Sequence, residues 1–435
     1  MLSAQRRREV IDALRRGTVP QRSLDAFAVG MRPFESTLDD ELTLVKSGGS
    51  VFKAVRGEYG SGKTFFARWM QERAKKAGFA VAEVQISETE TPLHRLETVY
   101  RRMIEHLATS DVDRGAVKSV FDAWFYTLEE DVLAAGSVNA NDAEGLLKKT
   151  NELLEQRLAS ISKSAPMFAA TLRAYREASA HGDAAGAEGL LAWISGQPNV
   201  AAAIKRIANV KGDIDHFGAL SFLQGLLVVL RDAGFSGLVV VLDEVETLQR
   251  VRGDVREKGL NALRQLLDEI DAGRFPGLYL MITGTPAFFD SPQGVQRLAP
   301  LAQRLHVDFS TDAKFDNPRA VQIRLRSFSM ESLVEVGSKV RTIYAERADS
   351  AERLNRLADD DYVLQLARAV AGKLGGKIGV APRIFLKKLV GDVLDRIDQF
   401  PDFDPRRDYA LTIADQEYNE YERAATKASD VELTL

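Results

Sequence analysis

The apolar residues in the first part of the chain form strand-like and helix-like patterns in turn. A short apolar run over 51–55 precedes a glycine-rich turn, and helical spacing follows from 63 to about 77. A second strand is expected over 79–86 and a second helix over 93–107. Strands that alternate with helices are typical of an α/β domain with a parallel sheet.

The same alternation resumes after residue 216. The continuous apolar run over 238–242 is typical of a strand that is buried on both faces of a parallel sheet. A helix is expected on each side of it, and a last strand is expected to close the sheet. These segments are the helices over 217–233 and 259–272 and the strands over 278–282 and 306–309.

Residues outside the alternating segments have mostly helical spacing. The Ala-rich stretch between the two α/β halves lacks strand patterns and predicts a helical insertion. The sequence therefore predicts four parts. Residues 1–109 hold an N-terminal segment and the first half of the core, 110–215 form the insertion, 216–312 form the second half of the core, and 313–435 form a helical C-terminal region with a possible winged helix. Helices outside the core and the insertion are expected over 6–16, 34–45, 319–325, 330–347, 360–374, 383–400 and 415–428.

Composition narrows the class of protein. The chain has 435 residues, 58 Lys and Arg against 62 Asp and Glu, and a net charge of −4. That balance excludes a generally polycationic nucleic-acid coat but not a local basic patch. The chain has no cysteine, which excludes disulfides, thiol catalysis and Cys-based zinc sites. The most apolar runs are too short to span a bilayer, so we expect a cytoplasmic protein without a membrane partner.

The strongest chemical signal lies between the first strand and its helix. The segment Gly57-Glu58-Tyr59-Gly60-Ser61-Gly62-Lys63-Thr64 fits GxxxxGK[ST] at every fixed position, and Phe65 follows it. Glycines let backbone amides turn toward a β-phosphate, and the helix N-terminus adds positive potential. Lys63 is expected to reach the β- and γ-phosphates, and the Thr64 hydroxyl is expected to ligate Mg²⁺. The sequence predicts a site for ATP and Mg²⁺.

A pair of carboxylates follows the buried strand over 238–242. Asp243 and Glu244 would lie at the carboxyl edge of the sheet, where phosphates bind in such folds. Asp243 is expected to hold the Mg²⁺ shell. Glu244 is expected to orient and deprotonate the attacking water, which favours hydrolysis over nucleotide binding alone.

Further polar residues follow in the second half of the chain. Thr283, with Thr285 as second choice, ends the strand over 278–282 and could bond the γ-phosphate or the water; a turn-capping role is the alternative. Arg297 or Arg304 could reach the γ-phosphate of a neighbouring subunit. Arg383 begins a helix after Gly379-Val380-Ala381-Pro382 and could fold back onto the phosphates from a C-terminal lid.

These motifs, in this order, resemble those of an AAA+ ATPase. The resemblance makes 57–64 the Walker A motif, Asp243-Glu244 the Walker B motif, Thr283 sensor-1, Arg297 or Arg304 the arginine finger and Arg383 sensor-2. The layout is most similar to the origin-recognition/Cdc6-like branch, in which a winged helix can follow the lid. Within that branch the chain resembles the ATP-binding proteins of BREX-type phage-defence loci, the BrxD-like family, through 13–20, Val29-Gly30, the Walker A text and 242–246.

The resemblance implies an ATPase in antiviral defence, with a helicase-like or other defence-system protein as partner and self-association into a homo-oligomer. It also implies that Val19, Pro20, Val29 and Gly30 line the adenine. One departure bears on the assembly: Lys63 and Asp243 are 243 − 63 = 180 positions apart, and the insertion that accounts for this could remodel subunit contacts.

Three functions remain open at this point. The first is a DNA-linked ATPase with double-stranded DNA as its partner, and the arginines near the N-terminus favour it, although the net charge of −4 does not. The second is a nucleotide-gated switch that binds protein partners through the insertion. A small-molecule kinase fits less well, because Glu244 favours water as the acceptor. The aromatic residues around Trp124 and Trp193 are expected to be core residues, although base stacking is the alternative.

Overall fold

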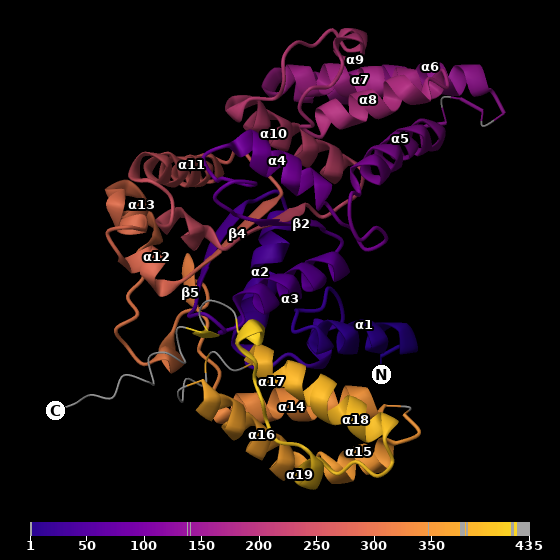
Figure 1. The fold of residues 1–435 in the computed structure, drawn as a ribbon. Helices are drawn as coiled ribbons and strands as arrows, with labels where there is room; N and C mark the ends of the chain where they lie inside the picture. The colour runs from indigo at the N-terminus through magenta and orange to yellow at the C-terminus, as the bar shows by residue number, and fades with distance from the viewer. Residues whose placement is uncertain are drawn as a thin grey trace. The chain divides into compact units, whose positions relative to one another are not determined.

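The computed structural model describes residues 2–136, 138–139, 141–346, 348–374, 379, 382–418 and 422–423 (Figure 1). These residues form two compact units. Unit 1 consists of Met1–Thr37, Val55–Glu72 and Asp308–Leu435, and unit 2 consists of Leu38–Ala54 and Arg73–Val307. The four-part division by sequence position stays a prediction.

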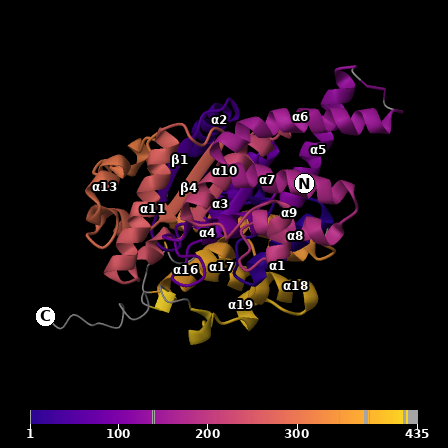
Figure 2. The same ribbon diagram turned by 90° about the horizontal axis from the view of Figure 1, so that it is seen from above.

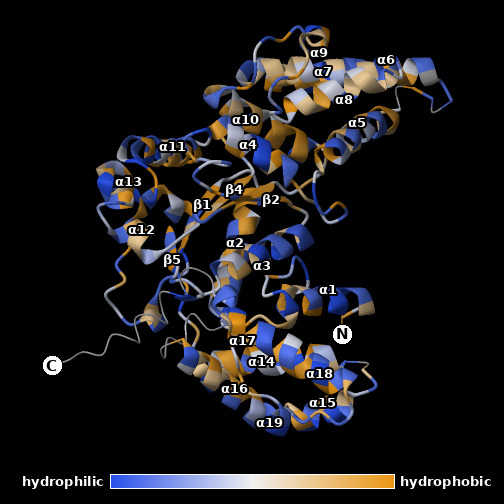
Figure 3. Ribbon diagram, in the orientation of Figure 1, coloured by the Kyte–Doolittle hydropathy of each residue, from blue (hydrophilic) through white to orange (hydrophobic). Residues whose placement is uncertain are grey.

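The strands form one five-stranded sheet in the order β2-β3-β4-β1-β5. β2 (Ala80–Gln85), β3 (Leu238–Asp243) and β4 (Leu278–Gly284) pair in parallel, with Leu242 opposite both Val84 and Ile282. Every residue of β3 and β4 is buried, as their continuous apolar sequences predict. Figure 3 accordingly shows β2 and β4 mainly in hydrophobic colours. The chain is therefore a mixed α/β protein.

The first strand crosses the boundary between the two units. β1 (Val51–Arg56) begins in unit 2 and ends in unit 1, where the Leu325 amide donates a hydrogen bond to the Arg56 carbonyl (2.8 Å). This bond lies at the end of β5 (Gln322–Arg324). The loop predicted to bind phosphate follows the last residue of β1 and leads into α3 (Lys63–Lys76).

The predicted closing strand lies in a different place. Residues 306–309 form no strand, and 319–325 do not form the expected helix; instead Gln322–Arg324 forms β5. Ile323 and Leu325 are buried with a spacing of two, the period of a strand. The ring of Phe309 instead lies 4.7 Å from the guanidinium of Arg56 and 5.1 Å from that of Arg324.

The helices cover most of the remaining chain. Side-chain caps begin several of them, for example Asp183 and Asp215, which accept hydrogen bonds from the amides of the third residue of α8 and of α10. Outside the insertion the helices are α1 (Ala4–Arg15), α2 (Arg32–Lys46), α3 (Lys63–Lys76), α4 (Leu96–Glu105), α10 (His216–Asp232), α11 (Gly253–Asp271), α12 (Pro286–Asp290), α13 (Ala299–Leu305), α14 (Met330–Ala345), α15 (Ala351–Leu357), α16 (Asp360–Lys373), α17 (Pro382–Lys388), α18 (Asp395–Gln399) and α19 (Pro405–Asp408).

The stretch between residues 110 and 215 is helical, and α10 connects it to the sheet region of unit 2. Its helices are α5 (Val117–Ala134), α6 (Ala143–Ser164), α7 (Pro166–Ala180), α8 (Ala184–Ile194) and α9 (Ala202–Ile207). Figures 1 and 2 show α6 and α7 lying together at one end of this unit. The ring of Phe222 on α10 packs against Phe168 (5.4 Å) and Trp193 (5.6 Å). Trp124 and Trp193 are buried, as their helical spacing predicts.

The C-terminal part of unit 1 is also helical. A π-helical stretch over Leu389–Leu394 joins α17 to α18, so the helix expected over 383–400 is present with a local change of winding. Of the helix predicted over 415–428, a short turn over Asp415–Glu417 lies among the described residues, while 419–421 and 424–428 lie outside them. Between 330 and 418 the described residues contain no strand, and no described helix is long and apolar enough to cross a membrane.

Candidate functional site

The loop over Gly57–Gly62, which the sequence predicts to bind phosphate, turns sharply at two glycines. Gly60 and Gly62 have φ angles of +82° and +90°, which residues with a Cβ rarely adopt. A Cβ on Gly57 would lie 2.3 Å from the Ser61 Oγ, so a larger residue there would displace the Ser61 hydroxyl. The amide of Phe66 donates to the Gly62 carbonyl (2.8 Å), which starts α3 directly after the loop. The helix N-terminus therefore begins at Lys63.

The loop side chains fit a triphosphate. Lys63 is only 8% exposed, and its Nζ donates to the Gly57 carbonyl (2.9 Å) and lies 4.9 Å from the ring centre of Tyr59. The Ser61 hydroxyl is buried and has no hydrogen-bond partner in the described part of the chain. An unpaired buried hydroxyl is uncommon, and a bound phosphate oxygen would satisfy it. Glu58 is exposed and Thr64 is half-buried.

The residues expected around the adenine lie in unit 1, beside the helix that follows the loop. The Val19 carbonyl accepts a hydrogen bond from Arg68 of α3 (2.7 Å), and Pro20 is buried. Phe65 of α3 packs edge-on against Phe27 with ring centres 5.3 Å apart. Val29 is half-buried. Gly30 has a φ of +76° and open space where a Cβ would be. The segment 19–30 is thus held against α3, and its role around an adenine stays a prediction.

The two carboxylates and Thr283 are brought together in unit 2. The Thr283 hydroxyl donates a hydrogen bond to Asp243 Oδ1 and accepts one from the Glu244 amide (3.1 Å). Thr283 is fully buried, and Asp243 is 4% exposed. Glu244 has a left-handed backbone with φ +60°, which turns the chain sharply after β3. Non-glycine residues with such a strained backbone, like Glu244, are found mostly at functional sites.

Gln85, which no sequence motif singles out, also lies beside this group. Gln85 is the last residue of β2 and pairs with Asp243 in the strand register. Its Nε2 donates to Glu244 Oε2 (3.0 Å), so it helps to orient the predicted base. The available signal was its position: a polar residue at the carboxyl end of a strand that neighbours β3.

Thr285 caps a helix. It is the N-cap of α12, and its hydroxyl accepts a hydrogen bond from the Phe288 amide (3.4 Å). This is the turn-capping role that the sequence left open for the threonines after β4.

The two candidate finger arginines make different contacts in unit 2. Arg304 pairs with two carboxylates of α11, Asp268 (2.6 Å) and Asp271 (2.8 Å). Arg297 lies 3.6 Å from Glu257, with 44% of its side chain exposed. Arg304 is therefore held on its own chain, whereas Arg297 is the more available of the two.

The predicted sensor-2 arginine is engaged by the end of the chain in unit 1. Arg383 Nε donates to Glu422 Oε1 (2.9 Å), and its Nη2 bonds the Glu417 carbonyl. The Glu417 carboxylate binds Lys387 (2.8 Å) and Lys388 (2.9 Å) of the same helix. Val380 and Ala381 of the predicted motif lie outside the described residues. Arg383 is thus bonded to chain groups in unit 1 rather than extended into solvent.

The chemistry of a Mg²⁺ ion suits the predicted ligands. In the described residues no cluster of three or more His, Asp or Glu is placed to hold a metal by itself. Mg²⁺ in nucleotide sites uses one or two protein ligands, several waters and the phosphates themselves. Thr64 in unit 1 and Asp243 in unit 2 have the oxygen donors that such an ion prefers.

The fold and the site define a class, a mixed α/β protein in which a glycine-rich loop joins a strand to a helix. The model for the BREX system ATP-binding protein BrxC/D matches residues 2–413, and the chain belongs to that family. It is therefore an ATP-binding protein of a phage-defence system. No curated protein matches the chain in sequence.

Proposed function

We propose that this protein is a Mg²⁺-dependent ATPase of the AAA+ class. The conformation of the phosphate loop carries the proposal: Gly60 and Gly62 turn the backbone, Lys63 is folded inward, and the Ser61 hydroxyl lacks a partner. A turned backbone, an inward-folded lysine and an unpaired hydroxyl suit a ligand that brings phosphate oxygens as acceptors. The family supports ATP as the nucleotide.

The roles of the side chains follow from their contacts. Lys63 would exchange its bond to the Gly57 carbonyl for phosphate oxygens, and Thr64 and Asp243 would each provide an oxygen ligand for Mg²⁺. The ion would neutralise charge that develops on the phosphates. Glu244 would accept the proton of the attacking water, with Gln85 holding its carboxylate in place. Thr283 acts through Asp243 and Glu244, as a positioning residue.

Steady-state ATP hydrolysis by the purified chain tests this proposal. Lys63→Ala should weaken ATP binding and abolish hydrolysis, because the loop loses its cation. Glu244→Gln should keep ATP binding and lose hydrolysis by about a hundredfold or more, because the amide cannot take a proton. Glu352→Gln, a change at an exposed carboxylate of α15 outside the site, is the control. Hydrolysis that survives in Glu244→Gln would rule out the assigned base.

The coupled activity is a separate part of the proposal. ATP turnover would drive DNA binding or remodelling with a helicase-like partner, in a homo-oligomer to which Arg297 contributes the finger. Hydrolysis measured with and without double-stranded DNA tests the link. Stimulation with steep salt dependence would support it, because phosphate contacts release counterions. An equal rate of ATP hydrolysis with and without DNA would contradict the coupling to DNA.

A second candidate is a nucleotide-gated switch that binds a protein partner through the insertion. The exposed apolar side chains of its helices are the residues to test: Tyr126 (61%), Leu147 (46%) and Ile207 (47%) face solvent. Replacing these three with Ser should abolish capture of the partner in the presence of ATP while ATP binding stays unchanged. Capture that persists would exclude the insertion as the partner surface.

A further inference from the structure

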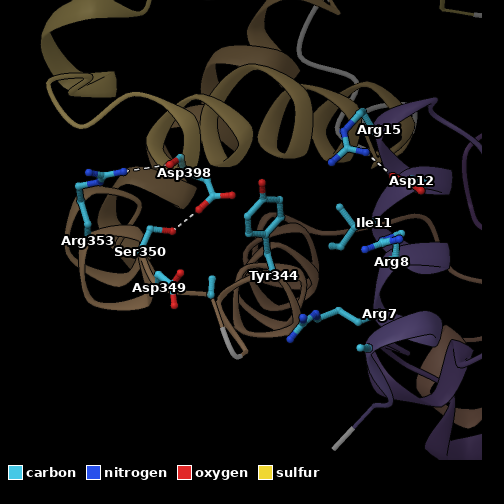
Figure 4. A pocket seen from close by; sticks show the side chains of 12 residues that line it. Arg7, Arg8, Ile11, Asp12, Arg15, Tyr344, Asp349, Ser350, Arg353 and Asp398 are labelled. Atoms are coloured by element: carbon cyan, nitrogen blue, oxygen red, sulfur yellow. Dashed lines mark hydrogen bonds and ion pairs between the residues drawn. The ribbon is translucent and has the colours of Figure 1, made fainter.

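A cleft of about 670 Å³ lies within unit 1 (Figure 4). The residues that line it do not include the predicted phosphate loop. One wall is α1, and the other is formed by α14, α15 and α18. Its size falls in the range of small-molecule sites, roughly 300–1,000 Å³. The side chains that line it and bear on its chemistry are Arg7, Arg8, Ile11, Tyr344, Asp349 and Asp398.

The α1 wall carries positive charge that the chain does not neutralise. Arg7 and Arg8 have no ion pair or side-chain hydrogen bond within the described part of the chain, and Arg7 Nη1 is buried without a partner. In contrast, Arg15 on the same helix is paired with Asp12 and with Asp395 (2.6 Å). A buried guanidinium N–H without an acceptor is costly, so an anion in the cleft would be stabilised there. Phosphate is the anion whose oxygens suit two neighbouring arginines.

The opposite wall has the reverse chemistry. The carboxylates of Asp349 and Asp398 face the cleft in Figure 4, and Ser350 donates a hydrogen bond to Asp398. Arg353 is turned onto the backbone carbonyls of Ile397 and Asp398, at the end of α18. Ionised carboxylates only accept hydrogen bonds, so this wall requires a ligand that brings hydroxyl or amino donors. A bare phosphate would be repelled from it.

An aromatic ring that is held in a fixed position occupies the middle of the cleft. The ring of Tyr344 stands between the two walls, with Ile11 of α1 beside it (Figure 4). The Tyr344 hydroxyl donates to Asp395 Oδ1 (2.7 Å), the same carboxylate that binds Arg15. Tyr344 and Arg15 are therefore held by one group, and the ring is a preformed surface for a planar moiety.

We propose that this cleft is a second nucleotide site. The phosphates lie on Arg7 and Arg8, the base lies against Tyr344 and Ile11, and ribose hydroxyls or base amino groups donate to Asp349 and Asp398. The proposal does not depend on hydrolysis at the phosphate loop. In this proposal the arginines of α1 bind a nucleotide and do not simply attract DNA. The acidic wall would repel a polyanion that brings no hydrogen-bond donors.

Counting bound nucleotide on the full chain tests the proposal. Equilibrium dialysis is carried out with labelled ADP, GDP, CDP and UDP in turn. At least one diphosphate should bind twice per chain, once at the phosphate loop and once in the cleft. Lys63→Ala should leave only the cleft site, and the double variant R7A/R8A should leave only the loop site. Arg6→Ala is the matched control, since Arg6 is an exposed arginine of α1 outside the cleft lining, and it should keep both sites.

The outcomes separate this proposal from the proposed ATPase. A single site for all four diphosphates, lost in Lys63→Ala and unaffected by R7A/R8A, would overturn the cleft site and leave the ATPase intact. Two sites with Lys63→Ala unaffected would overturn the phosphate loop assignment alone. Loss of duplex DNA binding in R7A/R8A, with one diphosphate site in both proteins, would assign the arginines to nucleic acid and refute the nucleotide. The melting temperature of R7A/R8A is measured as a folding control. A value equal to that of the wild type would show that the variant is folded.

Discussion

The Thr283 hydroxyl donates a hydrogen bond to Asp243 Oδ1, and the Glu244 amide donates to the same hydroxyl (3.1 Å). One buried side chain at the end of β4 thus fixes both carboxylate residues that follow β3. The neighbouring strand on the other side contributes Gln85, which holds the Glu244 carboxylate (3.0 Å). The predicted metal ligand and the predicted base are therefore oriented by bonds from two adjacent strands.

This arrangement predicts that Thr283→Val slows hydrolysis more than it weakens ATP binding. Valine keeps the shape but cannot donate to Asp243 or accept from Glu244, so both groups lose orientation. Removing a group that orients a metal ligand typically costs 10- to 100-fold, and we expect a fall in kcat of roughly that size with little change in KM. Thr283→Ser restores the hydroxyl and should recover most of the rate.

An equal loss in Thr283→Val and Thr283→Ser would show that the residue matters only for packing. A purely structural role would also lower the thermal stability of both variants in proportion to their activity. The split between kcat and KM, with rescue by serine, is the signature of positioning.

The sheet was predictable where a strand is defined by its own sequence. β3 and β4 are continuous apolar runs, and exposing such a run to water is unfavourable. Both are buried strands at the positions that the apolar pattern predicts. β5 is different, because its three residues become a strand through pairing with the end of β1. The Leu325 amide bonds the Arg56 carbonyl, and Arg56 Nη1 bonds Gln322 Oε1 (2.9 Å). Such tertiary contacts outweigh local spacing in a short segment.

The candidate site shows the same division. The positive φ angles of the predicted phosphate loop favour glycine, so this local motif can be recognised from the sequence. Gln85 was not, because its role depends on a neighbour 159 positions away, Glu244. The contacts of Arg383 with Glu417 and Glu422 likewise join helix α17 to the chain end, and no local pattern predicts them.

Removal of Mg²⁺ is expected to stop hydrolysis and weaken ATP binding. In the proposed site the ion would neutralise phosphate charge. In the wild type, ATP affinity should rise as Mg²⁺ is added back after chelation. In Asp243→Asn this dependence should be lost, since the ion loses its charged ligand. A Mg²⁺ response in Asp243→Asn equal to that of the wild type would refute the assignment of Asp243.

Gly237→Ala should destabilise unit 2. Gly237 precedes β3 with a φ of +145°, and a Cβ there would lie 2.4 Å from the Gly277 carbonyl oxygen, so the backbone must shift. Gly234→Ala is the matched control, because Gly234 has a φ of +87° with open space around the added carbon. The control should cost about 1–2 kcal/mol for its left-handed backbone, and Gly237→Ala should cost more. Equal melting temperatures for the two variants would contradict the close approach.

The ion pairs of Glu417 predict a pH-dependent contribution to stability. Burial opposes ionisation of this carboxyl, but hydrogen bonds from Lys387 and Lys388 outweigh burial and lower its pKa to about 2 from 4.5. The folded protein therefore holds the proton less tightly than the unfolded chain does. The stabilisation is fully present above about pH 4.5 and is lost as the pH falls toward 2.

Melting temperatures of the wild type and of Glu417→Gln should therefore differ at pH 6 and converge as the pH falls below 4.5. Glu352→Gln is the control, because Glu352 is an exposed carboxylate of α15 without a hydrogen bond or ion pair in the described part of the chain. It should follow the wild type at every pH. A constant difference between Glu417→Gln and the wild type across this range would show that the lysines do not depend on the charge of Glu417. The same substitution should loosen the chain end from α17, so limited proteolysis after residue 413 should be faster in Glu417→Gln than in the control.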